Sequence, residues 1–291
     1  MSAPGVWDVL TKSLEGDVVQ IVSGGVTDVG RVRTNNEDSF RIVEPLNLFI
    51  LSDGMGGEAH GEIASSMAVE TVEKYCSKPE GTKEDTDVPL DGASASNWAP
   101  QTKLLQNAVF QANSSIYQSA QKHPEQRGMG ATLTTGWING STLSLAHVGD
   151  SRAYLLRAGT LQQLTNDHSL VAEQVRRGIL TRQQAEESEM QSVLLRALGA
   201  NPEVDVEIDE VALMPRDVLL FSSDGLTRLV TEPEIAGNLQ AETDPRSAAQ
   251  KLVDLANERG GLDNVTVIVA RVQDESKGWF SWLRRDTSKK E

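Results

Sequence analysis

The sequence predicts an α+β protein in which two sheets pack as a sandwich with helices on the outside. Three observations support this fold class. The apolar pattern changes from helical spacing to the alternation of strands after residue 131. Two long amphipathic segments, residues 63–75 and 103–123, follow each other as helix pairs do. Strands and helices do not alternate regularly, which argues against a parallel sheet built from βαβ units.

The predicted strands are short apolar or alternating runs that end in turn residues. Asn139-Gly140 is a strong hairpin signal between two of them, and Ala158-Gly159-Thr160 marks a second hairpin. We expect strands within residues 23–41 (two short strands joined by a turn) and at 46–52, 131–138, 142–148, 152–157, 204–211, 217–223 and 264–272.

The remaining segments are helical or irregular. A third helix is predicted over residues 246–259, and residues 167–192 are polar with helical spacing. Residues 77–101 are rich in Asp, Glu, Ser, Gly and Pro, and we interpret them as an acidic insertion without regular structure.

Composition excludes several classes of protein. The formal charge of −15 argues against nucleic-acid binding, which needs an excess of Lys and Arg. No apolar run is long enough to span a membrane, and the first ten residues do not resemble a signal peptide, so we expect a cytoplasmic protein. The single cysteine, Cys76, lies on a helical stretch without a phosphate loop after it, which disfavours a cysteine nucleophile.

Acidic residues gather at the ends of the predicted strands. For any one site, the simpler explanation is that Asp and Gly are common in turns. Five such sites on neighbouring strands are harder to explain in that way, because two charges 4 Å apart repel by about 4 kcal/mol. A divalent cation would remove that cost, and oxygen ligands select Mg²⁺ or Mn²⁺ over zinc. The acidic residues are Glu37, Asp38, Asp53, Asp150, Asp224 and Asp263.

Arg33 precedes Glu37 by four residues, and we expect it on the strand that delivers this acid. A guanidinium fork suits a phosphate dianion, although a surface salt bridge is the alternative.

Eight segments together resemble, in order, the motifs of the metal-dependent Ser/Thr protein phosphatases, the type 2C-like or PPM family, and its bacterial branch in particular. The segments are TDVGRVRTNNEDS, DGMGGEAHGEIAS, GMGATLTT, VGDSRAY, LTNDHS, LLRALG, DVLLFSSDGL and GGLDNVTVIV. The resemblance covers residues 23–272, which leaves an N-terminal extension at 1–22 and a C-terminal tail at 273–291. It implies a four-layer α-β-β-α sandwich with two central antiparallel sheets, and a flap at residues 167–192.

The resemblance also implies roles for the acidic residues around Mn²⁺ or Mg²⁺, with two ions firmly bound and a possible third. Asp53 would bridge the two ions, and the carbonyl of Gly54 would bind the second. The other implied roles are Asp224 and Asp263 on the first ion, Glu37 on the second, Asp38 through ordered water, Asp150 on the third, and Arg33 on phosphate.

The implied activity is hydrolysis of phosphoserine and phosphothreonine by a metal-bridging water, with no phosphoenzyme. Phosphorylated proteins, including a Ser/Thr kinase, would be the partners. One departure concerns the proton donor, because Met55 stands where eukaryotic relatives often carry a histidine. His60 and His168 are candidates to replace it, and a metal-bound water is the alternative.

Two other functions remain open: a catalytically silent relative that binds phosphoproteins, and a hydrolase of small phosphoesters. A nucleotide-binding protein with a P-loop in its glycine-rich segments is excluded, because no G-x-x-x-x-G-K-[ST] motif occurs. The tail from Lys277 carries aromatic and basic residues, which suit either a weak membrane or partner contact or an unstructured terminus.

Overall fold

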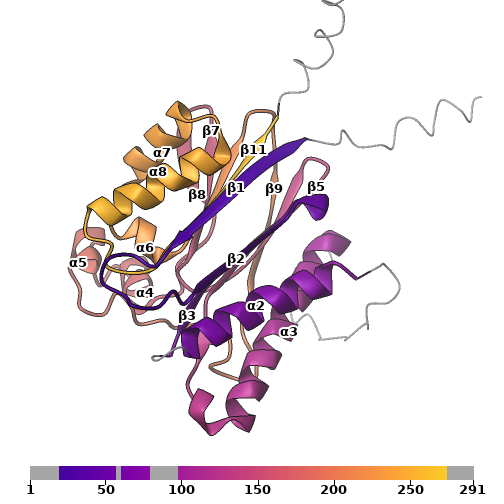
Figure 1. The fold of residues 1–291 in the computed structure, drawn as a ribbon, viewed down its shortest axis with the longest axis vertical. Coiled ribbons are helices and arrows are strands. Elements are labelled where there is room, and N and C mark those ends of the chain that lie inside the picture. Colours follow the sequence, from indigo (N-terminus) through magenta and orange to yellow (C-terminus); the bar gives the residue numbers. More distant parts are fainter. Residues whose placement is uncertain (1–19, 57–59, 79–97, 274–291) are drawn as a thin grey trace, which may run out of the picture.

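A computed structural model describes residues 20–56, 60–78 and 98–273. Two antiparallel sheets stack face to face, and helices cover the outer face of each sheet (Figure 1). The predicted four-layer α-β-β-α sandwich is confirmed. The predicted extension, the acidic insertion and the tail fall mostly on residues outside this description.

The first sheet has five strands in the order β1-β11-β10-β7-β8, and the second has the order β2-β3-β5-β6-β9 with β4 paired to β3. The strands of the first sheet are β1 (Ile21–Asp28), β7 (Arg152–Arg157), β8 (Thr160–Gln163), β10 (Val218–Ser222) and β11 (Val265–Val272). Those of the second are β2 (Asp38–Val43), β3 (Leu48–Met55), β4 (Gly130–Ala131), β5 (Leu133–Asn139), β6 (Thr142–Val148) and β9 (Glu207–Ala212).

Each central strand is apolar on both faces because each face is covered. Leu48 and Ile50 of β3 pack under the helices, whereas Phe49 points toward the other sheet. The same alternation in β10 directs Phe221 into the space between the sheets. There its ring stacks on that of Phe49, with centroids 5.8 Å apart.

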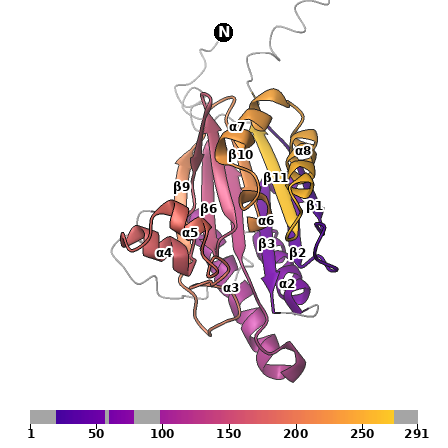
Figure 2. The same ribbon diagram turned by 90° about the vertical axis from the view of Figure 1, so that its left-hand side faces the viewer.

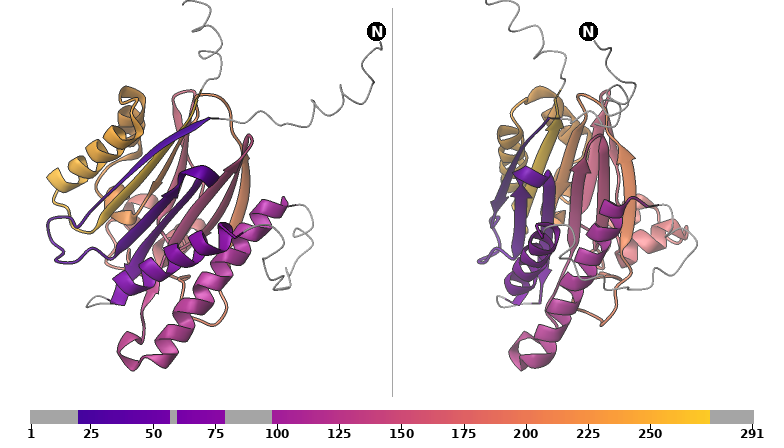
Figure 3. Two further views of the ribbon diagram at one scale, coloured as in Figure 1. Left: turned by 45° about the vertical axis from the view of Figure 1, so that its right-hand side comes forward. Right: turned by 90° about the vertical axis from the view of Figure 1, so that its right-hand side faces the viewer.

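The helices form the two outer layers, as the turned views show (Figures 2 and 3). Two long helices pack on the second sheet, α2 (His60–Cys76) and α3 (Pro100–Lys122). The first sheet is covered by α6 (Asp224–Thr227), α7 (Glu232–Ala241) and α8 (Pro245–Glu258). The structure also contains two short 3-10 helices, Glu44–Leu46 and Pro124–Gln126. In the described part of the chain, no helix has the length and hydrophobicity that a membrane span requires.

The predicted hairpin at Asn139-Gly140 is confirmed, because Asn139 pairs with Thr142 across the turn. The helical interpretation of residues 167–192 holds only in part. This segment contains two short helices, α4 (Leu170–Arg176) and α5 (Arg182–Glu186), which project from the side of the sandwich in Figure 2. Gly178, at a φ of +70°, lies between them and interrupts the helical backbone.

Candidate metal centre

Strands of both sheets carry carboxylates at the same end of the sandwich. In the second sheet, Asp38 on β2 is the direct cross-strand partner of Asp53 on β3. In the first sheet, Asp224 follows β10 as the first residue of α6, and Asp263 lies just before β11. Asp150 lies in the turn between β6 and β7, which joins the two sheets.

The carboxylate of Asp53 is surrounded by negative charge. Burial raises its pKa well above the usual range, and the negative charges of Asp38, Asp224, Asp150 and Asp263 raise it further. The backbone of Asp53 is held by Thr132, whose hydroxyl accepts from its N–H at 2.9 Å and whose own N–H donates to its carbonyl at 2.8 Å.

The Asp38 carboxylate is buried between the two sheets. Its Oδ2 accepts hydrogen bonds from Ser223 at 2.8 Å and from Thr266 at 2.6 Å, both in the first sheet or at its edge. Its Oδ1 is buried and has no hydrogen-bond partner among the described residues. Burial outweighs the two hydroxyl bonds and raises the pKa of Asp38 to about 7.

Asp224 and Asp150 are also buried. Burial, reinforced by the charge of Asp224, raises the pKa of Asp150 to about 7. Burial raises the pKa of Asp224 as well, against the opposing effect of Arg228, whose Nη2 lies 2.5 Å from Asp224 Oδ2. The Oδ1 of Asp224 is buried without a hydrogen-bond partner in the described part of the chain.

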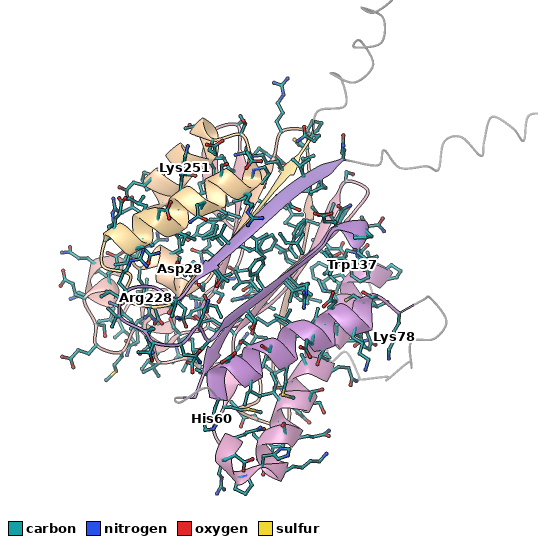
Figure 4. The ribbon with its side chains drawn as sticks, in the orientation of Figure 1. Asp28, His60, Lys78, Trp137, Arg228 and Lys251 are labelled. Atoms are coloured by element: carbon teal, nitrogen blue, oxygen red, sulfur yellow. The ribbon has the colours of Figure 1, made fainter. Side chains whose placement is uncertain are left out.

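Two arginines reach this cluster. Nη2 of Arg33 donates to Asp263 Oδ2 at 2.9 Å, and Arg228 Nη1 lies 3.9 Å from the same oxygen. Figure 4 labels Arg228 at the end of the sandwich where β1 stops at Asp28. The expectation that Arg33 lies on a strand is wrong, because it lies in the loop between β1 and β2. Gly30, at a φ of +85°, turns the chain out of β1 before Arg33 is reached.

Glu37 and Gly54 are in direct contact. Gly54 N–H donates to the carbonyl of Glu37 at 3.1 Å. A Cβ on Gly54 would lie 2.0 Å from the carbonyl oxygen of Gly61, and a Cβ on Gly61 would lie 2.7 Å from Glu37 Oε2. The two glycines therefore let β3, α2 and the Glu37 loop approach one another more closely than any larger residue would permit.

The chemistry of this cluster fits hard divalent cations. The donors are carboxylate oxygens, two of which are buried without a partner in the described residues, and their pKa values show the mutual repulsion that a cation would relieve. Among the described residues, no three or more His, Cys, Asp or Glu side chains are arranged as a group that could hold a metal ion as they stand. Arg33 and Arg228 instead pair with Asp263 and Asp224.

A cavity of about 780 Å³ opens beside the cluster, between the predicted flap and the start of α7. Its lining includes Asp150 and Asp224 from the cluster, Arg228 just after α6, and Arg182 and Gln191 from the predicted flap at residues 167–192. The flap segment therefore borders the same space as the carboxylates.

The candidate proton donors have different surroundings. His168 is buried, its Nδ1 accepts from Gly149 N–H at 3.1 Å, and its Nε2 lies 3.1 Å from Glu207 Oε2. Both ring nitrogens are thus engaged, which indicates a structural role. His60 begins α2 at the edge of the described residues (Figure 4). Cys76 is buried in the core under α2, where a phosphoester has no access.

Several residues of the site escaped the sequence analysis. Ser223, Thr266, Thr132 and Asn264 hold the cluster in place through hydrogen bonds. Ser223, Asn264 and Thr266 lie within three positions of an acidic residue at a strand end, which was the available signal, whereas Thr132 had no such signal. Arg228 had a weaker one, since it lies four residues after Asp224 and would face it only if a helix begins there.

Comparisons with known proteins identify the family. Residues 30–257 match the family model described as protein phosphatase 2C. The chain belongs to the protein phosphatase 2C family. It is 36% identical over 255 residues to the serine/threonine phosphatase stp of Listeria welshimeri, covering 87% of this chain and 96% of that one. It is also 36% identical over 252 residues to PstP of Mycobacterium tuberculosis, covering 87% of this chain and 45% of that one.

Solved structures of protein phosphatase 2C relatives have the same fold. The catalytic domain of the Ser/Thr phosphatase PstP, in complex with two manganese ions, superimposes with a TM-score of 0.76 at 34% identity. That match covers 88% of this chain and all of the PstP domain. The structural similarity to PstP therefore extends over both sheets and both helical layers of this chain.

Proposed function

We propose that the chain is a metal-dependent protein phosphatase that hydrolyses phosphoserine and phosphothreonine. The observation that carries this proposal is the convergence of five aspartates from two sheets beside Arg33, in a chain that belongs to the protein phosphatase 2C family. The manganese-bound PstP relative supports metal dependence.

Two ions, Mn²⁺ or Mg²⁺, would be held by Asp53, the carbonyl of Gly54, Glu37, Asp224 and Asp263. Asp38 would act through ordered water, and Asp150 would hold a third ion. When bound, such cations lower the pKa of a water molecule and neutralise charge on the phosphoryl oxygens.

The protein's own residues position the phosphoester. The side chain of Arg33 is 52% exposed, and its Nη2 donates a hydrogen bond to Asp263. Its remaining N–H donors suit the oxygens of a phosphate dianion. The buried carboxylates of Asp38 and Asp224 keep the floor of the site acidic, which favours cations there and leaves phosphate binding to arginine.

A direct attack of water on phosphorus requires no nucleophilic side chain, and the burial of Cys76 is consistent with this.

The partners we propose are phosphorylated proteins, among them a Ser/Thr kinase. The boundaries at 23–272, the flap at 167–192 and the cytoplasmic location remain predictions from the sequence.

Phosphate release from a phosphothreonine peptide tests the proposal. We expect turnover with Mn²⁺, none with EDTA, and none in Asp53→Asn with Mn²⁺. Asp254→Asn, on the exposed face of α8, is the matched control and should keep wild-type turnover. Peptide binding without turnover in the Mn²⁺-loaded wild type would favour the silent phosphoprotein binder. Faster turnover of free phosphothreonine than of the peptide would favour the small-phosphoester hydrolase.

A further inference from the structure

Two exposed apolar side chains lie beside the ion pair of Arg33 and Asp263. Val32 is 61% exposed and Leu262 is 57% exposed. Each is the chain neighbour of one partner in the ion pair. The backbone N–H of Val32 donates to the carbonyl of Gly261 at 3.2 Å, so the two loops run against each other.

The backbone that carries this pair is well fixed. Arg31 N–H donates to the Gly261 carbonyl at 2.7 Å, and Nδ2 of Asn264 donates to the carbonyls of Val29 and Asn35, both at 2.9 Å. A Cβ on Gly261 would lie 2.8 Å from the backbone nitrogen of Arg31. Val32 and Leu262 therefore project from a preorganised surface, which reduces the entropic cost of binding to them.

Exposed apolar side chains are concentrated around the site. Among the described residues, Met214, before β10, is the only large exposed apolar side chain that lies away from the site. The others lie next to Arg33 or in the segment bordering the cavity: Val32, Leu262, Ile179, Met190, Val193 and Leu195. Single exposed apolar residues are common on surfaces, but Val32 and Leu262 both adjoin the Arg33–Asp263 ion pair in the chain.

We propose that Val32 and Leu262 form a contact for an apolar side chain close to the phosphorylated residue of a protein substrate, and so help to select the substrate. The inference rests on the proposed function. A phosphate at Arg33 would bring the adjoining substrate backbone next to residues 32 and 262, which lie in the two loops joined by the Val32–Gly261 hydrogen bond. Arg31 and Arg33, the two exposed cations that flank Val32, are paired with Asp28 at 3.4 Å and with Asp263 at 2.9 Å, so the surface favours apolar over acidic neighbours.

Two phosphothreonine peptides test this inference, one with leucines and one with serines flanking the same phosphothreonine. With Mn²⁺ present, we expect the wild type to prefer the leucine peptide by about tenfold in kcat/KM. In the double variant Val32→Ser/Leu262→Ser, the ratio between the peptides should fall toward one. The conservative double variant Val32→Ile/Leu262→Met should keep the preference, and Met214→Ser is the matched control for an exposed apolar residue elsewhere.

The inference is overturned if the wild type shows no preference, or if the serine variant keeps it. An equal loss on both peptides also overturns it, because that result would indicate a disturbed Arg33 loop instead of a lost contact. Absence of wild-type turnover on both peptides and on p-nitrophenyl phosphate would instead overturn the proposed function itself, and this inference with it.

Discussion

The side-chain amide of Asn264 holds the backbone of Glu37, whose N–H donates to Asn264 Oδ1 at 2.8 Å. The other end of the same amide donates to the carbonyls of Val29 and Asn35. Asn264 is buried and immediately follows Asp263. One side chain at the start of β11 thus fixes the loop that carries Arg33 and the acid that follows it.

Replacing Asn264 by alanine should destabilise the protein by about 2–4 kcal/mol, because three hydrogen bonds are lost around buried backbone groups. Asn264→Asp should be at least as harmful, since two carbonyls would then face a carboxylate. Urea unfolding measures both effects. The exposed Asn201→Ala is the control, and we expect it to change the free energy of unfolding by less than about 0.5 kcal/mol. Wild-type stability in Asn264→Asp would show that the two donor bonds contribute little.

Gly54→Ala should unfold or severely destabilise the protein, by more than about 4 kcal/mol, because its Cβ would overlap the backbone carbonyl of Gly61. Gly237→Ala is the matched glycine substitution. No atom lies within 4 Å of a Cβ at this exposed position in α7. That variant should stabilise the protein by about 0.5–1 kcal/mol. Thermal unfolding compares the two, and a folded, fully stable Gly54→Ala would contradict the close packing described above.

Metal binding should stabilise the fold, since a cation relieves the repulsion among Asp38, Asp53 and Asp224. Mn²⁺ at about 100 times its Kd should raise the free energy of unfolding by about 2.7 kcal/mol for each site relative to EDTA. The increase should shrink in Asp53→Asn and persist in Asp254→Asn. Denaturant titrations with and without Mn²⁺ give the result, and an unchanged wild-type midpoint would argue against a metal site here.

His147 should make stability depend on pH. Burial, with a smaller effect from the charge of His168, lowers its pKa to about 4, against opposing effects of Glu207 and Asp167. The unfolded chain takes up this proton below about pH 6.5, whereas the folded protein resists it until about pH 4. The stabilising effect of neutral His147 is therefore complete above pH 6.5 and is lost as the pH falls toward 4, by about 3 kcal/mol.

The variant His147→Gln isolates this effect. In saturating Mn²⁺, lowering the pH from 6.5 to 4 should reduce the unfolding free energy of the wild type by about 3 kcal/mol more than that of the variant. A difference that stays constant over this range would show that His147 does not titrate in this way.

Local sequence was enough to predict most strands and the acidic residues at their ends. Asp53 and Asp224 each follow a run of buried apolar residues, and Asp224 lies just beyond the end of β10. The predicted strand end at residue 52 was wrong, because β3 continues through Asp53 to Met55, where it pairs with β4. Contacts between distant segments were beyond such reasoning. Thr266 donates to Asp38 across 228 positions of the chain, and this pairing depends on how the two sheets face each other. The position of Arg33 was mispredicted because its loop is shaped by Asn264, far away in the sequence.

The stacked rings of Phe49 and Phe221 have a consequence for the choice of ion. Phe49 precedes Asp53 by four residues on β3, and Phe221 precedes Asp224 by three on β10. We therefore expect the thickness of this aromatic layer to influence how far apart the two carboxylates lie. Mg²⁺ demands a tighter and more regular arrangement of oxygens than larger cations. At the proposed metal centre, we therefore expect the hydrophobic core to influence which ionic radius is accepted, and a substitution at Phe221 to alter metal binding.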